Sequence, residues 1–255
     1  MYETNPDFFP PKDKNVKIWR YMDITKFLFL LEKKSLYFSR ADCLGDPFEG
    51  SIPSTKEQIN LTELVKQEAR LKGFNPVGIT PIHEFIRKCS FVCSFHMNEY
   101  ESAALWSIYT KAHQGVAIQS TFSKLCDCFN EYSDNPIRIG MMNYIDYTTE
   151  TIPIFKNAFL PLLHKRKSFE YEKELRATIS FPNELYPSAH VAPPNEFINS
   201  IRGLDIPVDP NILIEQIYVA PTTEKWIKEL LVDITSKNGL DKPIEQSRLD
   251  AIPIL

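Results

Sequence analysis

Apolar and polar residues alternate along several short stretches of the chain. The alternation is clearest in residues 17–22, 36–39, 90–96 and 116–121. A period of two places successive side chains on opposite faces of a β-strand, so these stretches predict strands with one face in a core. In residues 90–96 the pattern puts Phe91, Cys93 and Phe95 on one face and Ser94 and His96 on the other.

Between the predicted strands the apolar spacing changes to that of helices. Asp23 is a suitable N-cap for a helix that ends near Lys34, which gives a β-α-β opening. A long helix is expected at residues 153–169, with the basic residues 164–167 at its C-terminal end, where cations are favourable. These elements predict a single α+β domain at 17–255, with a mixed central sheet flanked by helices. Residues 1–16 are expected to form an N-terminal arm, and the Pro-rich residues 182–197 an irregular connection.

Size and charge narrow the functional classes. The chain has 255 residues and a net charge of −4, which disfavours a polybasic binder of nucleic acid or anionic membranes. No apolar run is long enough to span a membrane, and the N-terminal residues do not form a signal peptide, so we expect a cytoplasmic protein without a membrane partner. The five cysteines lack the spacing of a disulfide framework or a zinc site.

Two stretches concentrate groups suited to chemistry. A predicted strand at residues 35–39 opens into a loop that contains Arg40, Asp46, Phe48 and Glu49. Loops held by a stiff scaffold are common places for functional residues, although a tight turn would explain this composition equally well. Later, Glu172, Glu174 and Arg176 share one face of a predicted strand, where they could form a reactive pair or a solvated ion pair.

Several motifs, in this order, resemble the bacterial domain-of-unknown-function family 2971. They span roughly residues 17–249: WRY before a helix, LYFSR followed by DPFEG, SFVCSF, LWSIYTKAHQGVAI, FEYEKELR before a strand, and IYVAP followed by Trp226. The chain departs from the family pattern at Gly45, where Asn is usual, and at Phe169, where Trp is usual. The family pattern by itself implies no activity.

A second, weaker resemblance is to ADP-ribosyltransferase-like domains, which carry an Arg or His on an early strand, a Ser or Tyr on the next strand and a late Glu-x-Glu. It implies a transferase or hydrolase that consumes NAD, with a toxin or an antiphage effector as one expected role. In this reading Glu174 stabilises the oxocarbenium-like transition state, Glu172 orients the acceptor, Arg20 holds pyrophosphate or ribose, and Tyr37 or Tyr109 stacks on nicotinamide. The full expected set of cofactor-binding residues is Arg20, Tyr21, Tyr37, Ser39, Arg40, Trp106 and Tyr109, and the expected substrate loop carries Asp46, Phe48 and Glu49.

Two other functions remain open. The residues Asp42, Asp46, Glu49, Glu172 and Glu174 could build a metal-dependent nuclease or phosphoesterase if the loop and the strand meet. A non-catalytic binding or regulatory domain is the other alternative. The expected partner is a nucleotide-like small molecule, with a protein or nucleic acid as acceptor. The transferase requires Arg20, Ser39 and Glu174 to converge on one cleft, whereas a binding domain would leave them scattered.

Overall fold

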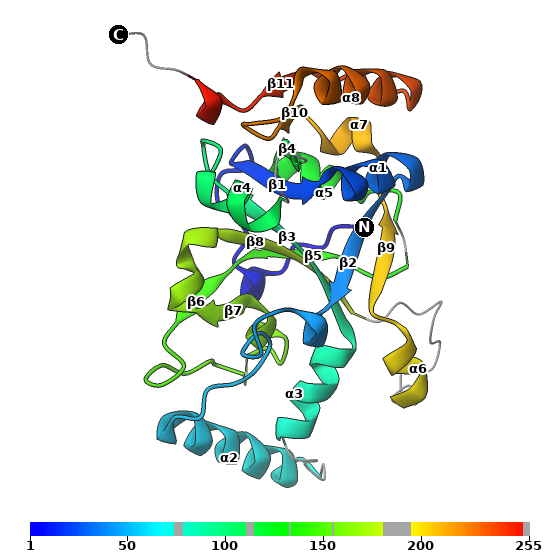
Figure 1. Cartoon of the computed structure of the whole chain (residues 1–255). Helices are drawn as coiled ribbons and strands as arrows, with labels where there is room; N and C mark the ends of the chain where they lie inside the picture. Colours follow the sequence, from blue (N-terminus) through cyan, green and yellow to red (C-terminus); the bar gives the residue numbers. More distant parts are fainter. Residues whose placement is uncertain (74–78, 111–114, 133, 155, 181–194, 252–255) are drawn as a thin grey trace.

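The computed structural model describes residues 1–73, 79–110, 115–132, 134–154, 156–180 and 195–251. Its centre is a mixed sheet with helices on both faces, which confirms the predicted fold class (Figure 1). The predicted connection at 182–197 lies outside the described residues as far as 194, and residues 195–197 begin a helix.

Nine strands of the described chain form the central sheet. They are β1 (Lys17–Asp23), β2 (Ser35–Arg40), β3 (Ser90–Met97), β4 (Gly115–Thr121), β5 (Arg138–Met141), β8 (Glu174–Ser180), β9 (Gly203–Pro207), β10 (Gln216–Val219) and β11 (Ile244–Gln246). The spatial order is β11-β10-β4-β1-β3-β2-β9, with β8 paired to both β3 and β5. Among these nine strands only β10 and β11 pair in parallel. Strands β6 (Asn143–Ile145) and β7 (His164–Arg166) form a separate two-stranded parallel sheet.

Eight α-helices surround the sheet in the described residues. They are α1 (Ile24–Lys33), α2 (Lys56–Leu71), α3 (Ile79–Lys88), α4 (Ala103–Tyr109), α5 (Phe122–Asp127), α6 (Asn195–Ser200), α7 (Pro210–Leu213) and α8 (Lys225–Lys237). Short 3-10 helices are η1 (Pro6–Phe8), η2 (Ala41–Cys43), η3 (Leu160–Leu163), η4 (Lys167–Glu172) and η5 (Arg248–Asp250). None of the described helices is long and apolar enough to cross a membrane.

The sheet buries apolar side chains on both faces. On one face α1, α5, α7 and α8 pack against the strands, and the predicted inward residues Phe91, Cys93 and Phe95 lie in this main core. On the other face α4 contributes Leu105 and Trp106 to a smaller cluster. Helix α1 begins as predicted, because the Asp23 side chain accepts a hydrogen bond from the backbone N–H of Lys26 at 2.9 Å.

Along one edge of β3 the strands β1 and β2 separate from each other, and the candidate site lies where they separate. Strand β1 pairs with β3 only at Ile18–Met97 and Trp19–His96, whereas β2 pairs with it only at residues 39 and 40. Between these pairings, residues 93–95 pair only with β8 among the described strands. Strands β1 and β2 are joined by α1, whose ten residues span about 15 Å. The two strands therefore diverge from each other along this edge of β3 (Figure 1).

The prediction of a long helix at residues 153–169 is wrong. The segment contains η3, the short strand β7 and η4 instead. Pro161 favours only the first turn of a helix, and the parallel pairing of β7 with β6 supplies the backbone hydrogen bonds that a helix would have supplied. The basic residues 164–166 therefore form β7, and Lys167 begins η4, instead of forming the last turn of a long helix.

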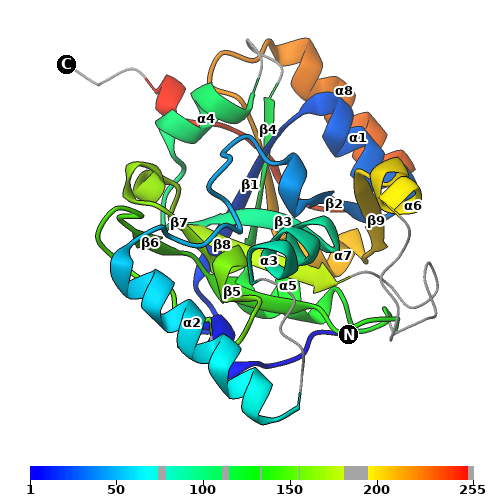
Figure 2. The same ribbon diagram turned by 90° about the horizontal axis from the view of Figure 1, so that it is seen from below.

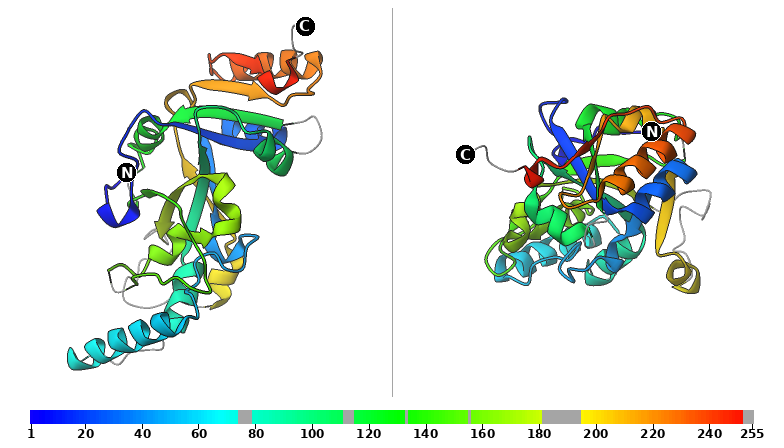
Figure 3. Two further views of the ribbon diagram at one scale, coloured as in Figure 1. Left: turned by 90° about the vertical axis from the view of Figure 1, so that its left-hand side faces the viewer. Right: turned by 45° about the horizontal axis from the view of Figure 1, so that its top comes forward.

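The molecule is elongated, with β10, β11 and α8 at one end and α2 at the other (Figure 3). Viewed from below, α1 and α8 lie on the opposite side of the sheet from α2 (Figure 2). Near the N-terminus Phe8 is buried against Met142 and Leu163. Its carbonyl oxygen would lie 1.7 Å from a Cβ at Gly140, so only glycine allows this close approach.

Candidate active site

A cleft of about 1170 Å³ opens where β1 and β2 diverge. Its walls come from β1, α1, β2, the loop after β2, the edge of β3, α4 and the segment from β7 to β8. Nine of the predicted site residues line it: Arg20, Tyr21, Tyr37, Ser39, Asp46, Glu49, Tyr109, Glu172 and Glu174.

Ser94 links the early arginine to the late glutamate. Its carbonyl oxygen accepts a 2.7 Å hydrogen bond from Nη1 of Arg20, and its hydroxyl donates to Oε1 of Glu174. The carbonyl is available because Ser94 lies in the part of β3 that neither β1 nor β2 pairs. The Arg20 guanidinium also lies 5.5 Å from the centre of the Phe95 ring. The divergence of the strands thus brings Arg20 and Glu174 to the same cleft.

Glu174 belongs to a buried charge network with Arg176 and Glu49. Nε of Arg176 donates to Oε1 of Glu174 at 2.7 Å, Nη1 donates to the Leu162 carbonyl at 2.8 Å, and Nη2 donates to Glu49. Burial alone would raise the pKa of the Glu174 carboxyl, but the nearby Arg176 and Lys165 cations lower that pKa well below its ordinary value. Glu174 is therefore a permanent anion at neutral pH.

Glu172 lies next to Glu174 in the cleft, but its pKa is shifted in the opposite direction. Lys173 between them has a left-handed backbone conformation with φ of 39°, which ends η4 and starts β8 so that both carboxylates line the cleft. The hydroxyl of Tyr109 donates to Oε1 of Glu172 at 3.3 Å. Burial and the neighbouring carboxylates Glu174 and Glu49 raise the pKa of Glu172, although Lys165 opposes them. Two neighbouring carboxyl groups with pKa values shifted in opposite directions can serve different roles in one reaction.

The loop after β2 is held by a second set of charged contacts. Arg166 donates to both oxygens of Asp46, at 2.9 and 3.2 Å, and its guanidinium lies between the rings of Phe48 and Phe169 at 4.7 and 5.4 Å from their centres. Phe48 also packs edge-on against Tyr147, with ring centres 5.3 Å apart. The loop therefore forms a fixed wall of the cleft.

Aromatic side chains stand at the edge of the cleft. Tyr37 and Tyr109 are 46% and 47% exposed, which leaves ring faces available for a ligand. The Tyr37 ring covers Gly203, where a Cβ would lie 2.1 Å from its Cζ. Tyr21 is more enclosed and accepts a hydrogen bond from the backbone N–H of Ser102.

Three predicted site residues do not line the cleft. Arg40 is buried behind β2, where it pairs with Asp42 at 2.6 Å and donates to the Ile201 carbonyl. Trp106 lies in the core beneath α4, with its indole N–H donated to Glu101. Phe48 faces Arg166 and Tyr147 instead. These side chains support the walls rather than contact the space between them.

Sequence reasoning missed Lys165 and Arg166. The two cations were assigned to a helix end that does not exist. His96 is buried in the cleft wall, and its Nδ1 donates to the Glu172 carbonyl at 2.6 Å. Burial lowers the pKa of His96. The signal that could have found Lys165 is its position a few residues before the Glu-x-Glu pair.

Three of the five carboxylates of the alternative nuclease do meet, but they meet around a cation of the protein. Glu49, Glu172 and Glu174 surround the Lys165 ammonium, whereas Asp42 and Asp46 pair with arginines. Within the described ranges, no group of three or more His, Cys, Asp and Glu side chains could hold a metal ion.

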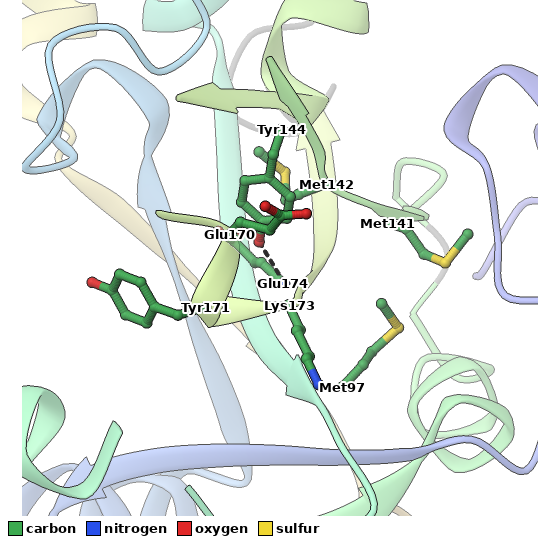
Figure 4. Close-up of a pocket in the computed structure, with 8 residues that line it drawn as sticks. All are labelled: Met97, Met141, Met142, Tyr144, Glu170, Tyr171, Lys173 and Glu174. Atoms are coloured by element: carbon green, nitrogen blue, oxygen red, sulfur yellow. Dashed lines mark hydrogen bonds between the residues drawn. The ribbon is translucent and has the colours of Figure 1, made fainter. Parts of the chain in front are cut away.

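A smaller hollow of about 620 Å³ adjoins the cleft at Tyr171 and Glu174 (Figure 4). Met97, Met141 and Met142 make it largely apolar. The Tyr144 hydroxyl accepts a 2.8 Å hydrogen bond from the backbone N–H of Glu174, shown as a dashed line in Figure 4. This contact fixes the start of β8.

Comparison with known families gives one match, to the model described as "Protein of unknown function (DUF2971)", over residues 105–177. This match confirms the predicted resemblance to the domain-of-unknown-function family 2971. The matched segment includes Tyr109, Lys165, Glu172, Glu174 and Arg176. No curated protein matches the sequence.

Similar solved structures include three complexes of DarT from Thermus sp. 2.9. The complex with NAD+ is 12% identical, covers 95% of this chain and 100% of that one, and has a TM-score of 0.39. The complex with carba-NAD+ is 11% identical, covers 93% and 98%, and has a TM-score of 0.38. The complex with ADP-ribosylated ssDNA is 13% identical, covers 93% and 96%, and has a TM-score of 0.38. Similarity this distant does not carry an activity from one protein to another.

Proposed function

We propose that the protein consumes NAD, cleaving the bond between nicotinamide and ribose and transferring the ADP-ribosyl group to an acceptor. The observation that carries this proposal is the meeting of Arg20 and Glu174 on Ser94 in a cleft that Ser39 also lines. The transferase required Arg20, Ser39 and Glu174 to lie in one cleft, and these three residues, from strands far apart in the sequence, do so.

The chemistry fits the two carboxyl groups. When the C–N glycosidic bond breaks, both electrons leave with nicotinamide, and positive charge develops on the ribose. The permanent Glu174 anion stabilises that charge. The acceptor then forms the new bond to the ribose carbon and gives its proton to Glu172, whose raised pKa suits a general base. With water as acceptor the same steps give NAD hydrolysis.

The remaining walls suit the rest of the dinucleotide. The cleft volume exceeds the roughly 300–1,000 Å³ of common small-molecule pockets, as an extended ligand requires. The Arg20 guanidinium offers forked donors to pyrophosphate or ribose. The exposed ring of Tyr37 or Tyr109 stacks on nicotinamide, and Tyr109 lies beside Glu172, where the ribose would be.

The acceptor is a nucleophilic group of a protein or nucleic acid, and a role as a toxin or an antiphage effector follows if that modification is harmful. The half-exposed Tyr37 and Tyr109 mark the edge of the cleft from which a group of a macromolecule would approach Glu172.

The direct test is release of nicotinamide from NAD by the purified protein. We expect Glu174→Gln to lower that rate about 100- to 1,000-fold, because it removes the anion and keeps the shape of the side chain. Glu150→Gln is the matched control, since Glu150 forms an exposed pair with Lys167 and lies outside the cleft lining. An intact NAD pool after incubation with water, protein and nucleic-acid acceptors would contradict the proposal.

A further inference from the structure

Lys165 is a buried cation that the proposed reaction does not use directly. Its side chain is 6% exposed, and its ammonium lies 2.6 Å from Oε2 of Glu172, 3.2 Å from Oε1 of Glu49 and 3.4 Å from Oε2 of Glu174. The ammonium also lies 4.7 Å from the centre of the Phe169 ring. One point charge therefore contacts both members of the Glu-x-Glu pair and the loop after β2.

The backbone fixes this lysine in place. Lys165 is the middle residue of β7 and pairs with Tyr144 of β6. Tyr144 in turn accepts the hydrogen bond from the Glu174 backbone, so the lysine and the glutamates are held by the same small unit. Removing charges from water is costly, and a buried ion pair is often no more stable than a well-packed apolar replacement. The arrangement is thus better explained by a role in the site than by fold stability.

Building on the proposed function, we propose that Lys165 is a positioning residue whose ammonium holds Glu172 and Glu174 together and keeps Glu172 ionised as the base. It contacts Oε2 of Glu172, which leaves Oε1 directed to Tyr109 and available to an acceptor. Glu49 shares the same ammonium, so the docked loop is part of the arrangement.

Other charged and titratable groups face this centre from each neighbouring element. They are Glu49 from the loop, Glu172 from η4, Glu174 and Arg176 from β8, Tyr109 from α4, Tyr144 from β6 and His96 from β3. Among them Arg176 already has Glu174 and Glu49 as partners. In the described part of the chain, Lys165 is the cation that contacts Glu172.

The consequence is a defined change with pH. Burial, Glu174 and Glu49 raise the pKa of Glu172, whereas Lys165 lowers it. Without the ammonium, burial, Glu174 and Glu49 lose the charge that mainly opposes them, so Glu172 takes up its proton at a higher pH. The acid limb of the rate profile reports the protonation of this base, so the limb moves to higher pH when the ammonium is removed.

The experiment compares Lys165→Met, Lys165→Arg and the wild type. We expect Lys165→Met to shift the acid limb of nicotinamide release upward by at least about one pH unit and Lys165→Arg to leave it near the wild-type position. Lys167→Met is the control, because Lys167 is exposed and pairs with Glu150 outside the cleft. An unshifted acid limb in a folded Lys165→Met protein would overturn the proposal.

A second measurement separates this proposal from the proposed reaction. The pKa of Glu172 can be followed in the ligand-free protein by NMR of ¹³C-labelled glutamate side chains, with Glu172→Gln used for assignment. A higher Glu172 pKa in Lys165→Met supports the role of Lys165 even if NAD is not the substrate, and an unchanged pKa refutes it. If Lys165→Met does not fold, Lys165→Gln, which keeps a hydrogen-bond donor without the charge, gives the same comparison.

Discussion

Arg176 shows how one side chain organises the buried charges. It is fully enclosed and donates to Glu174, Glu49 and the Leu162 carbonyl. Burial alone would lower the pKa of the Arg176 guanidinium, but the Glu174 and Glu49 carboxylates raise it. Arg176 therefore stabilises the fold around the cleft as well as the ionisation of Glu174.

Replacing Arg176 by Met should destabilise the protein by about 3–5 kcal/mol, because two buried carboxylates lose a partner. Urea unfolding measures the change. Arg138→Met is the comparison, since Arg138 pairs with the half-exposed Glu3 and its loss should cost at most about 1 kcal/mol. Equal effects of the two substitutions would show that the buried network does not contribute in this way.

At the residue scale the sequence was informative where a motif had fixed spacing. Glu174 and Arg176 line the cleft from β8 as the period of two suggested, and Arg20 reaches it from the first strand. Glu172 also lines the cleft, but from η4, because the left-handed Lys173 lies between it and β8. Lys165 was missed because its neighbours 160–163 are apolar and its followers are basic, a pattern that also suits the end of a helix. Only the pairing of β7 with β6, a contact distant in sequence, decides between the two structures.

At the scale of elements, the loop from residue 41 to 55 is held against β7 by charge. Asp46 is buried and accepts both hydrogen bonds from Arg166, while Glu49 reaches Lys165 and Arg176. The predicted substrate loop is consequently a part of the cleft wall whose position depends on ion pairs.

Asp46→Asn should loosen this loop, because a neutral amide cannot accept both bonds from the Arg166 fork. We expect limited proteolysis to cleave within residues 41–55 at least several times faster than in the wild type. Glu150→Gln, which removes an exposed ion pair, should leave the cleavage rate unchanged. Cleavage of the Asp46→Asn loop at the wild-type rate would show that its position does not depend on Arg166.

The helices and strands were largely predictable from the sequence, but the divergence of β1 and β2 along β3 was not. Asp23 marked the start of α1, and alternation marked β1, β2, β3 and β4. Nothing local indicates that β3 pairs with β1 at one end and with β2 at the other, because strand pairing depends on contacts between distant residues. The cleft exists because of that split, so its shape could be learned only from the fold.

At the scale of the whole molecule, the sheet brings residues from both halves of the chain to one place. Arg20 lies near the N-terminus, Ser94 in the middle and Glu174 in the second half, yet two hydrogen bonds join them. The central claim is that the space between β1 and β2 holds NAD.

Hydrogen exchange of the full-length Glu174→Gln protein, measured with and without NAD, tests that claim most directly. This variant should bind NAD and consume it slowly, so the complex persists during the measurement. We predict slower exchange in residues 17–23, 35–40 and 90–97, with no comparable change in α8. Unchanged exchange at these three strands with saturating NAD, or protection confined to another part of the molecule, would contradict the account.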